Sequence, residues 1–326
     1  MTKMTRTFSG LAAACLLIAS AVAQPASDYP RQPVRMIVTF PPGGSSDAVV
    51  RLVLPRLSEK LGQAVIVDNR PGAGGNIGMT AVATASADGY TMGVGAAGAL
   101  AANVSLNPKM PYDVKKDLRA VSLLAAIPFV LVGNSAMAPR SLPELIALAK
   151  AQPGSLSIAY GGNGTAMHLA TALLGQMAGV QWVEVPYKGT APAVVDAMAG
   201  QVSLAMADLP AALPHIRSGK LKAFAVTAPQ RLPQLPQTPT VAESGLPGYD
   251  ATGWFGVVAP AATPKEAIAR MNSAISYALK DPSVSETMRE MGVVPLSGTP
   301  DEFQAYIASE TTKWAKVIQQ GNIKIQ

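Results

Sequence analysis

Short apolar segments alternate with helix-like segments along most of this chain. Residues 34–40, 64–69 and 90–96 are apolar runs of strand length, and amphipathic runs at 45–62 and 72–89 separate them. Strands that alternate with helices of this length pair in parallel, and the helices cover both faces of the sheet. The alternation therefore predicts an α/β fold built on mostly parallel sheets.

The alternation occurs twice, over about residues 29–127 and again over 128–251, which is enough chain for two domains. The proline-rich stretch at 229–248 is predicted to be a surface loop. After it, the pattern predicts one strand and two amphipathic helices, at 253–260, 264–292 and 300–320. Thr299 or Asp301 is the predicted cap of the last helix.

The N-terminal residues have the pattern of a secretory signal peptide. Lys3 and Arg6 precede an apolar run, and Ala21-Val22-Ala23 is a small-x-small cleavage site. The run is shorter than the ~20 residues that a membrane-spanning helix needs. We therefore predict that residues 1–23 are removed and that the product is exported. Lipid attachment at Cys15 is the lesser alternative, since Ala12 stands where a leucine-like residue is expected.

Composition narrows the chemistry further. Cys15 is the only cysteine, so a chain cleaved after Ala23 would have no disulfide, cysteine nucleophile or thiolate metal site. The net charge is +6, but the basic residues are scattered and aromatic residues make up only 5%. This pattern does not favour nucleic-acid binding. No cofactor and no metal is predicted.

The stretch PPGGSSD, residues 41–47, stands where the first predicted strand ends and a helix begins. Three kinds of site could use it: a phosphate loop, a nucleophile turn or a cradle for another anion. A phosphate loop needs a lysine after the glycines, and none follows Gly44. The dinucleotide pattern fails in GAGGNIG, because Ile77 replaces its last glycine.

Catalysis by a serine nucleophile is also disfavoured. No G-x-S-x-G motif occurs in the chain, and His168 and His215 are the only histidines. Each is more simply explained as a structural or surface imidazole than as a base. The prediction is therefore a protein that is not an enzyme, with an exported α/β hydrolase as a third-ranked alternative.

An anion cradle agrees best with the residue types. A helix N-terminus presents unpaired N–H groups and the positive end of its dipole, and glycines allow close approach. The stretch YGGNGT, residues 160–165, repeats the design in the second half of the chain. Two such turns facing one cleft would hold both ends of a dianion. The simpler alternative is that both are merely tight turns.

Several stretches together resemble the tripartite tricarboxylate transporter substrate-binding family, the TctC or Bug-type receptors. They include VTFPPGGSSD, VDNRPGAGGNIG, YGGNGTAMHLA, VPYKGTAPAVVDAMAGQV and WFGVVAPAATP, and the resemblance covers about residues 29–326. It implies a two-domain periplasmic binding protein of type II, a Venus flytrap, with domains at 29–127 plus 252–326 and at 128–251. It implies a monomeric periplasmic receptor that passes a mono-, di- or tricarboxylate to membrane permease subunits. An exported sensor of the same fold is the alternative.

The resemblance also implies site residues. The first loop contributes one group of ligand-binding positions, which are Phe40, Pro42, Gly43, Gly44, Ser45, Ser46 and Asp47. The second turn and its helix contribute Gly161, Gly162, Asn163, Gly164, Thr165 and His168. The further positions in the cleft are Pro186, Tyr187, Lys188, Gly189 and Asp208. Lys188 could instead be a solvated charge, and Asp208 could cap the helix that begins at Leu209.

Two stretches depart from the family pattern. The predicted loop GAAGALAAN, residues 95–103, lacks the usual hydroxyl and amide side chains, and Ala96 and Ala97 would line the site. MADLP, residues 206–210, lacks the usual aromatic and asparagine neighbours of the aspartate. Both changes make the predicted pocket less polar. We therefore hypothesise a ligand that is bulkier or flatter than citrate, such as the aromatic carboxylate terephthalate.

Overall fold

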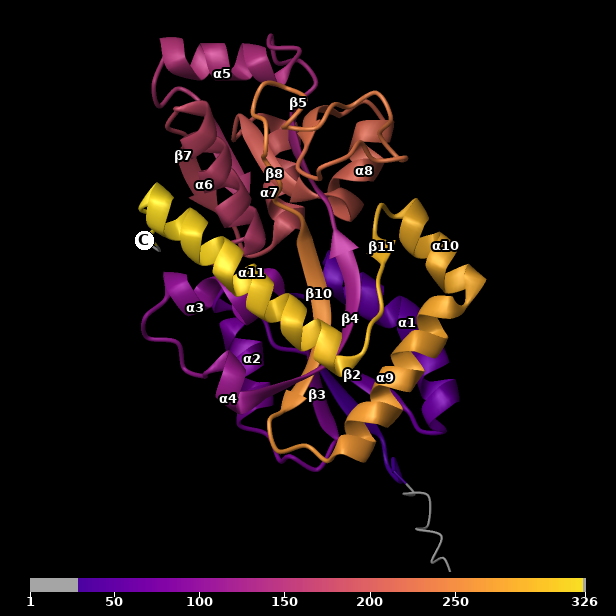
Figure 1. The fold of residues 1–326 in the computed structure, drawn as a ribbon. Helices are drawn as coiled ribbons and strands as arrows, with labels where there is room; N and C mark the ends of the chain where they lie inside the picture. The colour runs from indigo at the N-terminus through magenta and orange to yellow at the C-terminus, as the bar shows by residue number, and fades with distance from the viewer. Residues whose placement is uncertain (1–28, 325–326) are drawn as a thin grey trace, which may run out of the picture.

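The structure is a computed structural model that describes residues 29–324 (Figure 1). The predicted signal peptide, Cys15 and the Ala23 cleavage site lie outside the described residues. Within residues 29–324, no helix is both long enough and apolar enough to cross a membrane.

The described residues form two sheets. The first has six strands in the order β11-β4-β10-β3-β1-β2. Their bounds are β1 Val34–Val38, β2 Val65–Asn69, β3 Thr91–Ala96, β4 Leu118–Ile127, β10 Gly253–Pro260 and β11 Val294–Pro295. The second has five strands in the order β7-β6-β8-β5-β9. Their bounds are β5 Phe129–Asn134, β6 Ser157–Tyr160, β7 Val183–Pro186, β8 Leu204–Asp208 and β9 Leu221–Val226.

Helices pack around both sheets (Figure 1). The helices of the first half are α1 Ser45–Leu61, α2 Asn76–Ala83, α3 Asn103–Leu106, α4 Val114–Asp117 and α5 Leu142–Ala151. The later helices are α6 Ala166–Ala178, α7 Thr190–Ala199, α8 Leu209–Arg217, α9 Lys265–Lys280, α10 Pro282–Glu290 and α11 Pro300–Gly321. A short 3-10 turn at Ala73–Gly75 precedes α2, and a π-helical turn at Gly98–Ala102 precedes α3.

The chain crosses between the sheets twice. It leaves the first sheet at the end of β4 and enters the second at Phe129, and it returns between β9 and β10. The predicted two-domain α/β fold of periplasmic binding proteins is thus confirmed, with the double crossing of type II. The residue boundaries of the two domains stay a prediction.

The strand pairing is more mixed than the sequence predicts. The pairs of β1 with β2 and β3, and of β6 with β7 and β8, are parallel. The long strand β10 pairs antiparallel with β3 and β4, and β5 pairs antiparallel with β8 and β9. A strand that brings the chain into a sheet from the other domain need not follow a crossover helix, so its direction is not fixed by the βαβ unit.

Two local predictions are wrong. The predicted single helix at 264–292 is broken, because Pro282 disfavours helical geometry at Asp281, whose φ and ψ are −65° and 123°. Asp281 then caps α10 by accepting from the amides of Ser283 and Val284. The stretch 98–106 is helical and not a loop, as its many alanines favour. At the last helix, Thr299 and Glu302 form a capping box, which confirms Thr299 as the cap.

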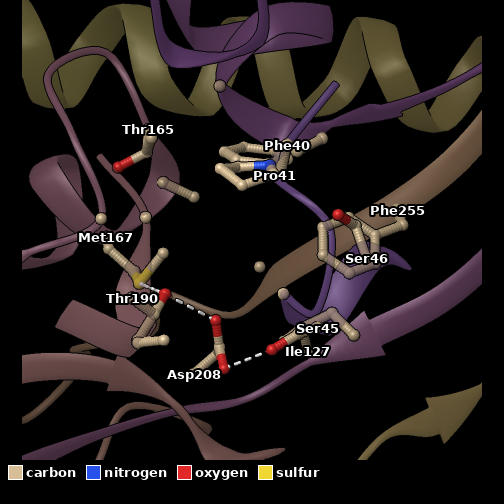
Figure 2. A pocket seen from close by; sticks show the side chains of 18 of the residues that line it. Phe40, Pro41, Ser45, Ser46, Ile127, Thr165, Met167, Thr190, Asp208 and Phe255 are labelled. Carbon is tan, nitrogen blue, oxygen red and sulfur yellow. Dashed lines mark hydrogen bonds between the residues drawn. The ribbon is translucent and has the colours of Figure 1, made fainter. Parts of the chain in front are cut away.

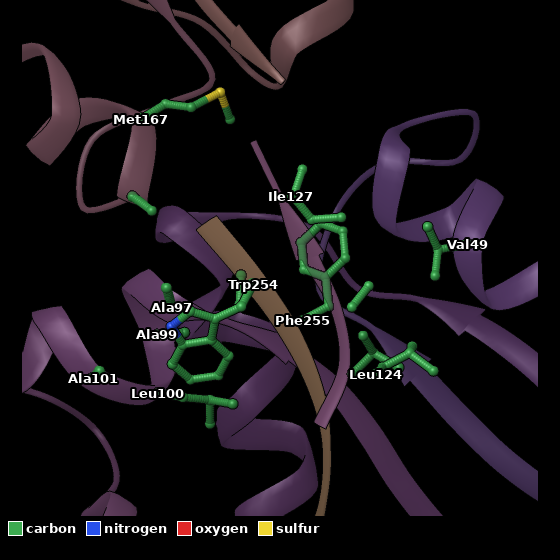
Figure 3. Close-up of a cluster of buried hydrophobic side chains, with 14 of the residues drawn as sticks. Val49, Ala97, Ala99, Leu100, Ala101, Leu124, Ile127, Met167, Trp254 and Phe255 are labelled. Carbon is green, nitrogen blue, oxygen red and sulfur yellow. The ribbon is translucent and has the colours of Figure 1, made fainter. Parts of the chain in front are cut away.

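The core of the first sheet reaches the space between the two sheets. Trp254 of β10 is buried and meets Phe303 of α11 edge to face at 5.7 Å. Its indole N–H and that of Trp314 both donate to the buried Glu310 carboxylate, at 3.0 and 3.1 Å. Figure 3 shows part of this core, including Leu100, Ala97 and Trp254. The wall that faces the second sheet is therefore apolar and well supported.

Candidate functional site

A cavity of about 230 Å³ lies between the two sheets. Residues from the carboxyl ends of strands and the first turns of helices line it, and Figure 2 shows it from close by. The lining includes many of the predicted ligand-binding residues, namely Phe40, Pro42, Gly43, Gly44, Ser45, Ser46, Ala96, Ala97, Gly161, Thr165, Lys188 and Asp208. The structure thus brings together both glycine-rich turns and the alanine-rich wall at one place.

The first turn of α1 is open on the side of the cavity. Its N-cap residue is Gly44, which has no side chain to bond the first-turn amides. Ser46 is only 2% exposed, lines the cavity, and its Oγ atom has no hydrogen-bond partner. A buried hydroxyl without a partner is costly unless a ligand satisfies it. The N–H groups, the helix dipole and this hydroxyl together form a site suited to an anion.

Asp47 stabilises this loop through hydrogen bonds from a buried position outside the cavity lining. Its carboxylate accepts from the Gly43 amide at 3.0 Å, from Arg51 Nε at 2.8 Å and from Asn69 Nδ2 at 3.0 Å. Burial alone would raise the pKa of Asp47, but these hydrogen bonds outweigh it and lower the pKa below its ordinary value. The sequence predicts Asp47 as a ligand-binding residue; it is buried but not part of the cavity lining. It fixes the positive φ of Gly43, 78°, and so positions the loop.

Asp208 lies on the other side of the cavity, at the end of β8. Ser45 Oγ donates to its Oδ1 across the two domains, and Thr190 Oγ1 donates to its Oδ2 at 2.7 Å (Figure 2). The Ala211 amide donates to Oδ1 at 3.1 Å, so Asp208 also caps α8. Burial raises the pKa of its carboxyl, against the opposing effect of these hydrogen bonds. Asp208 is therefore both a helix cap and a lining residue.

The first turn of α6, unlike that of α1, has a capping side chain. Thr165 Oγ1 accepts from the His168 amide at 3.3 Å and donates to the Gly162 carbonyl at 2.7 Å. His168 Nδ1 accepts from the Gly164 amide, and its ring stacks on Tyr160 with centroids 5.1 Å apart. His168 Nε2 lies 3.4 Å from a Glu184 carboxylate oxygen.

Only some of the residues predicted in this second turn reach the cavity. Gly161 and Thr165 line it, whereas Gly162, Asn163, Gly164 and His168 do not. Gly164 and His168 support the turn from within the domain. Their prediction as ligand-binding residues therefore has no support from the geometry.

A second, outer cavity of about 570 Å³ adjoins the first. Gly162, Asn163 and Tyr187 line it, and Phe40, Gly161 and Lys188 line both cavities. The exposed Lys188 therefore stands where the outer cavity meets the inner one. Tyr187 Oη donates to Asp196 at 2.6 Å, and this hydrogen bond raises the pKa of Tyr187 to about 12. The outer cavity has the position of an approach to the inner one.

Several lining residues were not predicted from the sequence. The first turn of α7 is the main omission: Gly189 before it was predicted to line the cleft, but Thr190, which bonds to Asp208, was not. The signal was present in YKGTAPA, where glycine and a hydroxyl residue precede a helix as they do at α1. The other missed residues come from both sheets and their connections, namely Pro41, Gly74, Gly98, Ile127, Phe129, Ala166, Met167, Ala191, Pro192, Gly253, Trp254 and Phe255.

Glycines bring the two domains into backbone contact beside the cavity. A Cβ atom on Gly98, after β3, would lie 2.3 Å from the carbonyl oxygen of Gly164, before α6. A Cβ atom on Gly74 would lie 2.6 Å from the Asn163 carbonyl oxygen. Any side chain at these two positions would hold the domains apart in this arrangement. The α6 turn thus forms a surface on which the domains close.

Two sheets joined by a double crossing, with a cavity between them, define the periplasmic-binding-protein class of fold. The chain belongs to a particular family within it, the tripartite tricarboxylate transporter family receptors, whose family model matches residues 49–323. The family predicted from the sequence motifs is confirmed. No group of three His, Cys, Asp or Glu side chains suited to a metal ion occurs within residues 29–324.

Relatives with known names agree with this assignment. The protein BugT of Bordetella pertussis is 42% identical over 320 residues, covering 97% of this chain and 98% of BugT. The structure of R. palustris Rpa4515 with adipate superposes with a TM-score of 0.87 at 37% identity, covering 91% of this chain and 99% of that one. MatC from Rhodopseudomonas palustris with bound malate gives a TM-score of 0.84 at 32% identity, covering 89% and 100%.

Proposed function

We propose that this protein is an exported, periplasmic substrate-binding receptor of a tripartite tricarboxylate-type transporter, and that it captures a small carboxylate in the inner cavity. The observation that carries the proposal is the first turn of α1, where Gly44 leaves the amides uncapped and the buried Ser46 hydroxyl has no partner. A carboxylate would accept hydrogen bonds from both. The adipate and malate bound to the two R. palustris relatives support this ligand class.

The walls of the cavity favour a flat or aromatic carboxylate over citrate. Ala96, Ala97, Met167 and Phe255 supply apolar surface, and Phe129 and Trp254 extend it. The cavity volume of about 230 Å³ exceeds the ~150 Å³ of an apolar cavity that holds benzene. A ring with small substituents therefore fits, and a molecule with three carboxylates on one short chain would leave apolar surface unmatched.

The role of a receptor without catalysis is supported by the hydroxyls of the site. Ser45 and Thr190 donate to Asp208, whose carboxylate also caps α8, and Thr165 donates to a backbone carbonyl, so these hydroxyls have structural partners. Both ring nitrogens of His168 have partners, since Nδ1 accepts from the Gly164 amide of the α6 turn and Nε2 lies beside Glu184 of β7. Membrane permease subunits are the partners that this family role calls for. The predicted signal peptide, residues 1–23, would bring the protein to them.

A thermal-shift and calorimetric screen of carboxylates tests the proposal. We expect at least one of citrate, glutamate, malate, adipate, benzoate and terephthalate to raise the melting temperature, because a ligand that binds only the folded state stabilises it. An aromatic carboxylate should bind more tightly than citrate. The Ser46→Ala variant should weaken binding on the order of 10-fold or more, as expected for one hydrogen bond to a charged group.

The matched control is Ser309→Ala, which removes an exposed serine hydroxyl of α11 that bonds only within its own helix. This variant should bind as the parent does. Failure of every carboxylate to stabilise the folded protein, or unchanged affinity of Ser46→Ala, would contradict the proposed function. Citrate binding more tightly than the aromatic acids would contradict only the proposal that the ligand is flat or aromatic.

A further inference from the structure

We propose that Asp208 makes the inner cavity selective for a monocarboxylate whose other end carries a hydrogen-bond donor, such as a hydroxyl or amine, and that it rejects a second carboxylate there. This inference rests on the proposed function and narrows its ligand class. It also changes the hypothesis drawn from the sequence, since terephthalate has a carboxylate at each end.

Almost all of the hydroxyl groups that line the cavity already donate their proton to an acceptor within the protein. Ser45 and Thr190 each donate their single proton to the Asp208 carboxylate, and Thr165 donates its proton to the Gly162 carbonyl. Among the serine and threonine side chains that line the inner cavity, Ser46 alone has an oxygen without a hydrogen-bond partner. The cavity therefore has side-chain hydroxyl support for one anionic group, at the first turn of α1.

Asp208 itself can accept another hydrogen bond but cannot donate one while it is ionised. A carboxylate has about four acceptor positions on its two oxygens. Two donors bond to Oδ1, from Ser45 and the Ala211 amide, and Thr190 bonds to Oδ2. One position on Oδ2 is left for a ligand. A hydroxyl or amine on the ligand could fill it, whereas a carboxylate could not.

The charges around the cavity also disfavour a second ligand carboxylate beside Asp208. Lys188 and Asp208 are the two charged residues in its lining, and Lys188 is exposed, at the junction with the outer cavity. Asp208 is only 5% exposed, and its hydrogen-bond partners are all uncharged. Like charges repel strongly where little water separates them. A second ligand carboxylate beside Asp208 would meet this repulsion without a buried cation to offset it.

The first turn of α7 does not provide a second anion site. It begins at Thr190 after an uncapped Gly189, but Asp208 already lies against it and accepts from Thr190. A second anion at this helix end would therefore lie beside the charge of Asp208, which is within hydrogen-bond distance of the Thr190 hydroxyl. The raised pKa of Asp208 agrees with an apolar setting that already disfavours one charge.

The experiment compares four probes of one ring size, namely benzoate, 4-hydroxybenzoate, 4-aminobenzoate and terephthalate, by isothermal titration at pH 7.5. For the parent protein we expect 4-hydroxybenzoate or 4-aminobenzoate to bind at least 10-fold more tightly than terephthalate, with benzoate between them. In Asp208→Asn the ratio of the affinity for 4-hydroxybenzoate or 4-aminobenzoate to the affinity for terephthalate should fall at least 10-fold. The reason is that the amide has no charge and offers a donor. Asp208→Ser should narrow the ratio as well, since serine keeps a cap for α8 and removes the charge.

The matched control is Asp196→Asn, which removes an aspartate that bonds Tyr187 and does not line the inner cavity. It should leave the ratio unchanged. Terephthalate binding as tightly as the hydroxy acid to the parent protein would overturn the inference, and so would an unchanged ratio in a folded Asp208→Ser or Asp208→Asn variant. If no carboxylate of any kind binds, the proposed function fails instead, so the two failures are distinguishable.

Discussion

Helices α1 and α6 both follow a glycine-rich turn at the carboxyl end of a strand, and both turns border the inner cavity. At α1 the N-cap is Gly44, and the buried Ser46 hydroxyl has no partner. At α6 the N-cap is Thr165, whose hydroxyl accepts from the His168 amide and donates to the preceding turn. The first turn of α1 thus has no capping side chain, while that of α6 is capped by Thr165.

The difference teaches that glycines alone do not make an anion site. Glycines at α1 leave the amides accessible, whereas those before α6 let Gly164 approach Gly98 of the other domain. What separates the two uses is the capping side chain, which competes with a ligand for the same amides. Substitutions that exchange or remove these features test the comparison directly.

The largest effect is expected when α1 receives a cap of its own. In Gly44→Asp the new carboxylate would bond the first-turn amides, because Gly44 has the extended φ and ψ of a capping residue, −75° and 167°. Its charge would also repel a ligand anion. We expect carboxylate affinity to fall on the order of 100-fold or more in calorimetry, about 3 kcal/mol, while the melting temperature stays equal or rises slightly.

Gly62→Asp is an unsuitable control because Gly62 has a positive φ of 70°. Gly298→Asp serves better, since Gly298 lies in the first domain and a Cβ there would meet only the flexible Glu302 side chain within 3.4 Å. This control should keep its affinity. A Gly44→Asp protein that binds as tightly as the parent would show that the first turn of α1 is not the anion site.

The next largest effect is expected at the closing surface of the α6 turn. In Gly98→Ala the added Cβ would overlap the Gly164 carbonyl oxygen in the arrangement that the structure describes. Overpacking of this kind costs roughly 1–3 kcal/mol, which predicts an affinity loss of about 5- to 150-fold. Calorimetry measures the loss, and small-angle scattering of the ligand-bound protein should show a more open molecule. Gly298→Ala should bind normally; equal affinity of both variants would contradict a closing role for this contact.

A smaller effect is expected on the pH dependence of stability, through Asp47 of the α1 turn. Hydrogen bonds from Arg51 and from the Gly43 and Asn69 amides outweigh burial and lower the pKa of Asp47, so its contribution to the free energy of unfolding is present above the ordinary aspartate pKa of about 3.9. The contribution is lost as the pH falls through the lower pKa of the folded state. Urea unfolding at pH 7 should find Asp47→Asn less stable than the parent by about 1–3 kcal/mol.

The same comparison at pH 3 should give a smaller difference, because Asp47 of the unfolded chain is then largely protonated and part of the contribution is lost. Asp301→Asn is the control, at an exposed position in the first turn of α11, and should change little at either pH. A difference that does not shrink in acid would mean that the charge of Asp47 does not stabilise the loop.

The smallest effect is expected from the α6 cap. Thr165→Ala removes the hydroxyl that bonds the His168 amide, and loss of such a cap costs about 1 kcal/mol. The free energy of unfolding should fall by this amount, while carboxylate affinity should change less than about threefold, because the turn does not hold the ligand. Affinity that falls as far as in Ser46→Ala would restore α6 as a second anion site.

The α/β class and the two-domain fold follow from the sequence, because the period of strands and helices is local and repeats. The mixed pairing does not follow, since the direction of β10 and β5 depends on how the chain crosses between domains. The break at Asp281 was visible in the Asp-Pro pair, but the continuous amphipathic pattern on both sides concealed it. The helical state of 98–106 was obscured because glycine and alanine suit both loops and helices.

The site divides in the same way. The α1 loop and Asp208 were predicted from local residue types and from family resemblance, and both lie at the cavity. The roles of His168 and Gly164 could not be predicted, because they depend on which hydrogen bonds the folded turn has already satisfied. The walls from Phe129, Met167 and Trp254 come from segments distant in sequence, so no local motif marks them.

The two connections between the domains are hydrogen-bonded neighbours on both sides of the crossing. Gly253 of β10 pairs with Ile127 of β4, and on the other side Val226 of β9 pairs with Val130 of β5. Bending of this connection would change the angle between the domains while the hydrogen bonds within each sheet are kept. A partner that touches both domains would therefore meet a different surface when the cavity opens or closes.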